Sequence, residues 1–223
     1  MASHLDLEEQ EQLDELKHFW KRWGDVITWA LIVVLGAYAA WTAWQSWSNR
    51  QAAQAAALYD TVERAAILGD VALLERAVAD IEDKYASTTY AQQSAMLAAR
   101  IFSDKDNGTA ARKQLQWLID HGSDEAYQAL ARLRLAALLM QAQSFDEARK
   151  LLSAKVPEAF APLVADRLGD LASMQNQPAQ AVEHYLQAWQ GMEPNTEYRR
   201  LVAVKLAALG KDPEELPKAE GKK

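Results

Sequence analysis

The chain has 223 residues, a length that allows one or two domains. Half of its residues are hydrophobic and 25% are charged, which excludes wholesale disorder. The absence of cysteine excludes disulfide scaffolds, thiolate metal sites and a cysteine nucleophile. The formal net charge of −7 argues against a strongly basic nucleic-acid-binding protein, so we expect no nucleic-acid partner.

A charge-free stretch near the start predicts a membrane-spanning helix. Residues 26–49 contain no charged side chain. At a rise of about 1.5 Å per residue, about 20 residues cross a hydrocarbon core of about 30 Å. Six of the eight tryptophans lie within residues 20–47, towards both ends of the stretch, where the indole ring favours the membrane–water boundary. We predict a transmembrane helix over residues 26–46.

A cleaved signal peptide is the competing interpretation, because Ala37-Tyr38-Ala39 resembles a cleavage site. However, the 25 residues before the apolar stretch carry seven acidic side chains, whereas a signal peptide normally begins with a short basic region. We therefore expect an uncleaved anchor in a membrane protein.

The basic residues beside the span indicate its orientation. Lys17, Lys21 and Arg22 precede it, whereas Arg50 and Arg64 follow it. This bias favours a cytoplasmic N-terminus and a C-terminal domain on the other side of the membrane.

Residues 1–25 then form a cytosolic acidic amphipathic tail. Within it, Leu13, Leu16, Trp20 and Trp23 fall on one face of a helix predicted over residues 5–23. Two interpretations stay open: a solvated helix leading into the membrane, or a short docking element for a basic cytosolic partner.

The rest of the chain predicts an all-α fold. Alanine and leucine dominate residues 50–223, whereas the β-branched residues that favour strands are scarce. Short polar breaks separate apolar runs with helical periodicity, which indicates antiparallel helix pairs. Second helices of these pairs are expected to start at Asp70, Thr109, Ser144 and Pro178. We predict a helical domain over residues 47–210 and a disordered tail over residues 211–223.

The helix pairs repeat. Leu135-Ala136 is followed twelve residues after Ala136 by Ala148, and Leu168-Gly169 is followed twelve residues after Gly169 by Ala181. The two copies are 33 residues apart. This pattern resembles the tetratricopeptide repeat, whose period is about 34 residues. The resemblance implies an α-solenoid, in which a terminal helix over residues 198–209 covers the last pair.

Small residues explain the register of the repeat. Gly169, Ala181 and Ala188 let the two helices of a pair approach closely, and Tyr185 is expected to fill the groove beside them.

The motifs of the common enzyme classes are missing. The sequence has no HExxH, GxGxxG, P-loop or GxSxG motif, and its four histidines are dispersed. We expect neither an enzyme nor a cofactor or metal site.

A solenoid of helix pairs offers a concave surface, lined by the first helix of each pair, to a peptide or partner helix. The methionines in the three copies would adapt to varied partners, although they could equally fill gaps in the core. A second expected contact face lies on the membrane helix, where small residues one turn apart permit another helix to approach. The predicted groove residues are Gln93, Met96, Arg100, Leu133, Ala137, Met140, Asp166, Asp170 and Met174, and the membrane contact residues are Gly36, Ala40, Trp41 and Trp44.

The segment from Glu8 to Trp23, followed by Gly24, the apolar span and the alanine-rich repeats, resembles the YfgM family. These proteins are ancillary subunits of the SecYEG translocon in Gram-negative bacteria. The resemblance implies a single-pass inner-membrane protein with a periplasmic repeat domain and a partnership with a PpiD-like periplasmic chaperone. It also implies that unfolded exported proteins are passed to periplasmic chaperones, and that the cytosolic tail restrains a response regulator.

Two other functions stay open at this stage. The repeats could form a structural scaffold for a fixed membrane complex, or the chain could be a regulator that acts through its cytosolic tail.

Overall fold

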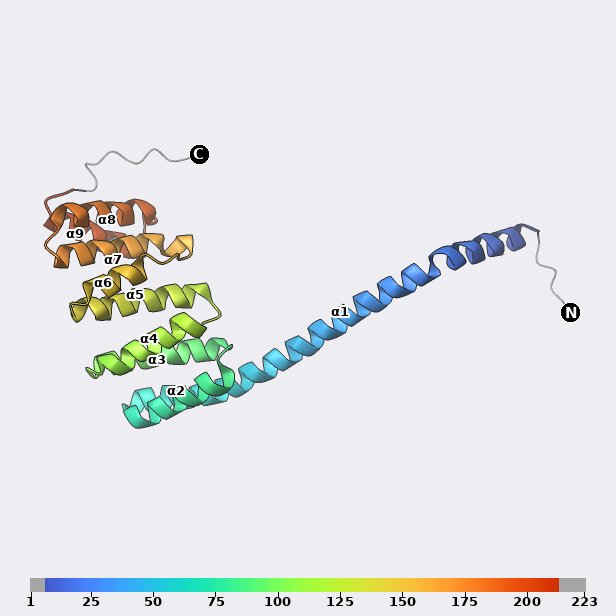
Figure 1. Cartoon of the computed structure of the whole chain (residues 1–223), viewed down its shortest axis with the longest axis horizontal. Helices are drawn as coiled ribbons and strands as arrows, with labels where there is room; N and C mark the ends of the chain where they lie inside the picture. The colour runs from blue at the N-terminus through green and yellow to red at the C-terminus, as the bar shows by residue number, and fades with distance from the viewer. Residues whose placement is uncertain (1–6, 213–223) are drawn as a thin grey trace. The chain divides into compact units, whose positions relative to one another are not determined.

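The computed structural model describes residues 7–212, with side chains from residue 13 onward, and this part of the chain is helical without a strand. The contacts divide the chain into two compact units, residues 1–51 and residues 52–223. The predicted disordered tail, apart from Lys211 and Asp212, lies outside the described residues. The all-α repeat architecture expected from the sequence is confirmed (Figure 1).

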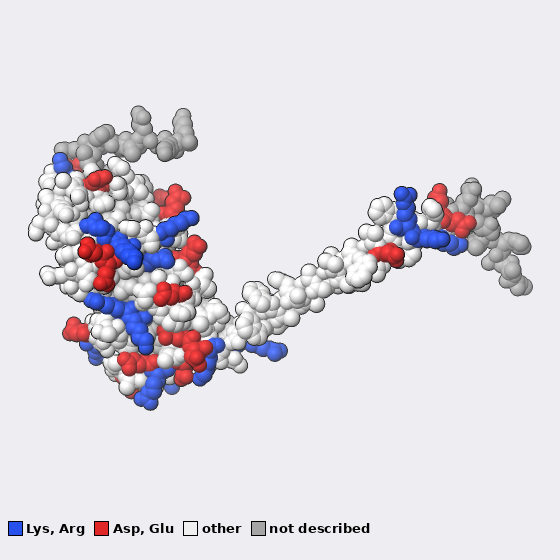
Figure 2. Space-filling model, viewed as in Figure 1, with Lys and Arg blue, Asp and Glu red and all other residues white. Residues whose placement is uncertain are grey.

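The first unit consists of the greater part of helix α1 (Leu7–Leu68). By length and composition, α1 is a candidate membrane helix from Leu13 onward, and none of its most apolar stretch is buried inside the structure. Figure 2 shows a long part of α1 with neither basic nor acidic side chains. Before this stretch, the Trp20 indole packs over Gly24, where an added Cβ would lie 3.2 Å from the ring.

The second unit begins at Ala52 and contains the end of α1 and the remaining helices. Consecutive helices pack as pairs, with α3 on α4, α5 on α6 and α7 on α8, and each pair stacks on the next (Figure 1). The helices are α2 (Val71–Tyr85), α3 (Thr89–Asp104), α4 (Gly108–His121), α5 (Glu125–Gln141), α6 (Phe145–Leu152), α7 (Ala161–Met174), α8 (Pro178–Gly191) and α9 (Glu197–Ala208), with the 3-10 helix η1 (Glu158–Phe160) before α7.

Polar side chains fix where several helices begin. The Asp70 carboxylate accepts a hydrogen bond from the Leu73 amide at 3.0 Å, and the Asn107 side chain accepts one from the Ala110 amide at 3.1 Å. Each bond satisfies a backbone N–H that the helix itself leaves without a partner. The helix expected to start at Thr109 therefore begins one residue earlier, at Gly108, because Asn107 is its cap.

Helices α7 and α8 approach each other closely where the repeat pattern predicts it, between Gly169 and Tyr185. A Cβ added to Gly169 would lie 2.5 Å from the Tyr185 ring, a separation that side chains do not tolerate. Ala181 and Ala188, on either side of Tyr185, are fully buried, and Tyr185 is only 4% exposed. Glycine thus allows the aromatic ring to pack directly on the backbone of α7.

We expect Gly169→Ala to lower the free energy of unfolding by about 1 kcal/mol, and by about 2 kcal/mol at most. Overpacking a core costs about 1–3 kcal/mol, and the better helix propensity of alanine offsets about 1 kcal/mol of that cost. The measurement is urea denaturation of the full chain in detergent, followed by circular dichroism. Gly108→Ala is the matched control, because a Cβ there meets no atom within 4 Å. Equal stability of the two variants would contradict the packing explanation.

Candidate functional site

Two adjacent cavities lie along the first helices of three successive pairs. A cavity of about 380 Å³ lies between α3 and α5, and one of about 300 Å³ lies between α5 and α7. Ala137 and Gln141 of α5 line both, so the two cavities adjoin along this helix. We call this continuous surface the first-helix groove.

Five of the nine predicted groove residues line these two cavities: Arg100, Ala137, Met140, Asp170 and Met174. Met174 is 47% exposed and is the most accessible of the predicted methionines. Gln93 lies elsewhere on α3, where its amide donates a hydrogen bond to the Tyr127 hydroxyl at 3.3 Å.

Four of the predicted groove residues are buried, which corrects the expectation that all nine face a partner. Met96 and Leu133 belong to the core between the helix pairs and are 9% and 7% exposed. Met140 forms part of a cavity wall but is itself only 3% exposed. Asp166 is fully buried. Of the three methionines, two therefore fill the core, and only Met174 offers an apolar side chain to a partner.

Asp166 is the centre of an ionic network that holds the terminal helix α9. Its carboxylate accepts hydrogen bonds from the Lys205 ammonium at 2.8 and 2.9 Å and from the Tyr198 hydroxyl at 2.7 Å. The Lys205 ammonium also donates to Asp170 at 2.7 Å, and the Tyr185 hydroxyl donates to the same Asp170 oxygen at 2.9 Å. Two predicted groove residues are thus used to attach α9 to the last helix pair.

The two tyrosine hydroxyls in this network remain protonated donors. Burial, reinforced by the hydrogen bond to Asp170, raises the pKa of Tyr185 far above its ordinary value. Burial, together with the hydrogen bond to Asp166, does the same to the pKa of Tyr198. Both shifts favour the neutral phenol, which donates its proton to a carboxylate.

The groove also contains arginines that the sequence analysis missed. Arg134 lines the cavity between α3 and α5, and Arg167 lines the one between α5 and α7. Together with Arg100 they recur at intervals of 34 and 33 residues, which is the period of the repeat. A search for charged residues in the repeat register would have found them.

One buried carboxyl lies away from the groove. Glu82 of α2 has a side-chain oxygen that is buried without a hydrogen-bond partner in the described part of the chain. Burial raises the pKa of Glu82 to about 7, although the charges of Lys113 and His121 oppose the shift. The protonated form of Glu82 is therefore well populated near neutral pH.

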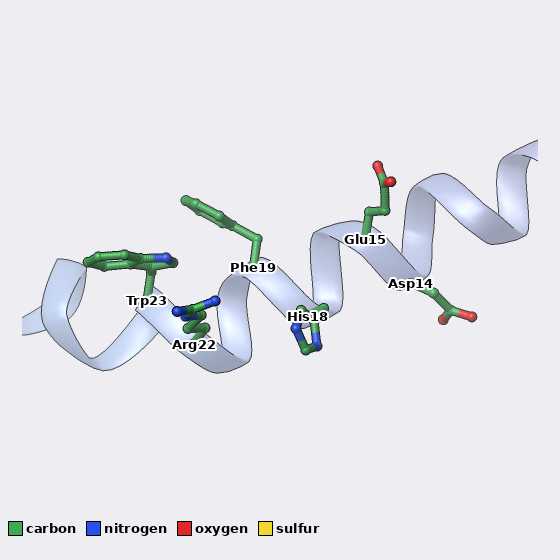
Figure 3. A pocket seen from close by; sticks show the side chains of 6 residues that line it. All are labelled: Asp14, Glu15, His18, Phe19, Arg22 and Trp23. Carbon is green, nitrogen blue, oxygen red and sulfur yellow. The ribbon is translucent and has the colours of Figure 1, made fainter.

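The tail presents a mixed surface on one side of α1 before the apolar stretch. Figure 3 shows that the side chains gathered there all come from this single helix, with Phe19 and Trp23 beside the charged groups. Lys17 forms an exposed ion pair with Asp14 at 3.1 Å, a contact that contributes little to stability. The six residues of this surface are Asp14, Glu15, His18, Phe19, Arg22 and Trp23.

The predicted membrane contact residues are all exposed on α1. Gly36 has open space where a Cβ would lie. Trp41 and Trp44 are 58% and 61% exposed, as expected for side chains that face lipid or another helix. Ala40 lies in the same exposed stretch of the helix.

The described residues contain no group of three or more histidine, aspartate or glutamate side chains placed to hold a metal ion. What the geometry supports is recognition through the first-helix groove.

Comparison with known proteins identifies the family. A model of the tetratricopeptide repeat-like domain matches residues 17–211. The chain is 31% identical over 210 residues to the ancillary SecYEG translocon subunit of Neisseria gonorrhoeae, covering 94% of this chain and 100% of that protein. The chain belongs to the YfgM family of ancillary SecYEG translocon subunits.

More distant YfgM relatives carry the same name. The ancillary SecYEG translocon subunit of Haemophilus influenzae is 27% identical over 82% of this chain and 90% of its own length. The Escherichia coli protein is 29% identical over 73% of this chain and 78% of its own length. The family predicted from the tail, span and repeats is therefore confirmed.

We expect Lys205→Met to destabilise this YfgM protein by about 3 kcal/mol, because breaking a buried ion pair leaves an uncompensated charge and costs about 3–5 kcal/mol. The Asp166 side chain that would lose its cation is 1% exposed. The measurement is urea denaturation of the full chain. Lys150→Met is the matched control, because Lys150 is exposed and forms no ion pair with any described residue. Equal stability of the two variants would contradict the role of Lys205 in attaching α9.

Proposed function

We propose that this chain is a non-catalytic, membrane-anchored interaction protein of the Sec translocon, whose repeats help pass newly translocated proteins to periplasmic chaperones. In this proposal residues 26–46 of α1 cross the inner membrane once. The N-terminus is cytoplasmic and the repeat domain is periplasmic. The positive residues before the span support this orientation.

The first-helix groove is the observation that carries the proposal. It runs over three helix pairs and combines the exposed Met174 with small side chains such as Ala137 and with basic groups. A surface of this kind suits polypeptide segments of varied sequence, because methionine adapts to different apolar partners. The relatives are named as ancillary subunits of the SecYEG translocon, which supports a place for this chain beside the emerging polypeptide.

Two further partners belong to the same proposal. A PpiD-like periplasmic chaperone would receive the client from the repeat domain. A cytosolic response regulator would bind the tail, where Phe19 and Trp23 are exposed next to acidic groups. The exposed apolar face of α1, including Gly36 and Trp44, is the proposed contact with a neighbouring membrane helix.

Site-specific photocrosslinking in intact membranes tests the groove. A photoreactive residue at Met174 should crosslink to a secretory protein during its translocation. The same residue at the exposed Gln116 of α4, away from the first-helix groove, should not. Filling the groove with Ala137→Trp should reduce the yield at Met174 at least threefold, because Ala137 lines both cavities. Equal crosslinking from Met174 and Gln116 would overturn the proposal.

A further inference from the structure

The first-helix groove carries one arginine per repeat, each on the first helix of its pair. Arg100 of α3 and Arg134 of α5 line one cavity, and Arg167 of α7 lines the next. Their spacing of 34 and 33 residues places them at equivalent positions of successive repeats. Because equivalent positions in a solenoid lie in a row, the three guanidinium groups form an ordered basic series along the groove.

The carboxylates of the groove, Asp104 and Asp170, compensate this series only in part. Arg100 and Asp104 are 3.7 Å apart, in a largely exposed pair. Arg167 donates to Asp170 at 3.1 Å, but the Asp170 carboxylate also accepts from Lys205 and Tyr185. The Arg167 Nε atom is buried and has no acceptor in the described part of the chain.

Arg134, the middle member, is the least compensated of the three. It forms no ion pair with any described residue, although it lines a cavity in which it could meet a ligand. Its partial burial, and then the positive charge of Arg100, lower the pKa of Arg134 from its ordinary value. The two like charges therefore repel each other across the cavity, and an anion placed between them would relieve this repulsion.

We propose that the first-helix groove selects extended polypeptide segments that carry spaced carboxylates, with Arg134 as the central contact. This inference rests on the proposed function and specifies the chemistry of the bound chain. A guanidinium group matches a carboxylate in a bidentate geometry, so arginine gives both charge and orientation. The whole chain has a net charge of −7, so this local basic series is not a consequence of a generally basic surface.

Helix geometry sets the spacing of the carboxylates. Packed helices lie about 8–10 Å apart. An extended chain in the polyproline II conformation rises about 3.1 Å per residue and presents every third side chain on the same face. Successive arginines are therefore about three residues of extended chain apart. The residues between the carboxylates would rest on Ala137, Leu138 and Met174, so small or apolar side chains fit there. The preferred segment has an acidic residue at every third position with apolar residues between.

A fluorescent peptide tests this specificity. The full chain in detergent is titrated against a labelled ten-residue peptide with glutamate at every third position and alanine or leucine between, and binding is followed by fluorescence anisotropy. A twin peptide has glutamine at the same positions. We expect the acidic peptide to bind about tenfold more tightly than its twin, and Arg134→Gln to weaken the acidic peptide about tenfold. Arg134→Lys should give an intermediate affinity, because lysine keeps the charge and loses the fork of donors.

Lys150→Gln is the matched control, since it removes an exposed cation from the second helix α6 and should leave binding unchanged. Equal binding of the two peptides, or an equal loss in the Arg134→Gln and Lys150→Gln variants, would overturn the inference. If this specificity fails while Met174 still crosslinks to translocating proteins, only the chemistry of recognition is wrong. If the crosslinks are absent as well, the proposed function is wrong.

Discussion

The requirement that a charge-free stretch of α1 leave water is the constraint on which the proposed function depends. Val33 and Leu35 are more than half exposed in the structure, as are the tryptophans of this stretch. None of the most apolar stretch of α1 is buried within the described part of the chain. The proposal therefore places this stretch in a hydrocarbon phase. A helix satisfies its own backbone hydrogen bonds, so α1 can enter that phase alone. If α1 crosses once, all the repeats lie on one side of the membrane, where they can meet clients only of that compartment.

Within the repeat unit, stability and the proposed recognition depend on different parts of the same helices. Alanine and glycine allow the two helices of a pair to approach closely. In the last pair, the Tyr185 ring of α8 packs against Gly169 of α7. The network of Asp166 and Lys205 then attaches α9 and closes the stack, as a solenoid requires of its terminal helix. The side chains that the proposal assigns to binding, Met174 and the arginine series, are largely those that neither task uses.

Sequence reasoning predicted the fold well because the repeat pattern is local. The start of α2 follows from the capping residue Asp70, whereas Ser144 precedes α6 without a side-chain capping hydrogen bond. The contact of Gly169 with Tyr185 follows from a spacing within one helix pair. The groove was predicted less well because exposure depends on distant elements. Asp166 is buried by Lys205, which lies 39 residues further along the chain and in a helix that the repeat register does not describe. Met96 is buried because its helix α3 packs against neighbours on several sides. The alanine-rich sequence of this helix does not show which of its side chains face solvent.

Cysteine labelling tests the membrane anchor and its orientation most directly, because the natural chain has no cysteine. His18→Cys places one thiol on the exposed tail, and Lys150→Cys places one on the exposed surface of the repeats. Each variant is treated in intact spheroplasts with a maleimide reagent that does not cross membranes. We predict that Lys150→Cys is labelled at once and that His18→Cys is labelled only after lysis. Labelling of His18→Cys in intact spheroplasts, or protection of Lys150→Cys, would contradict the account.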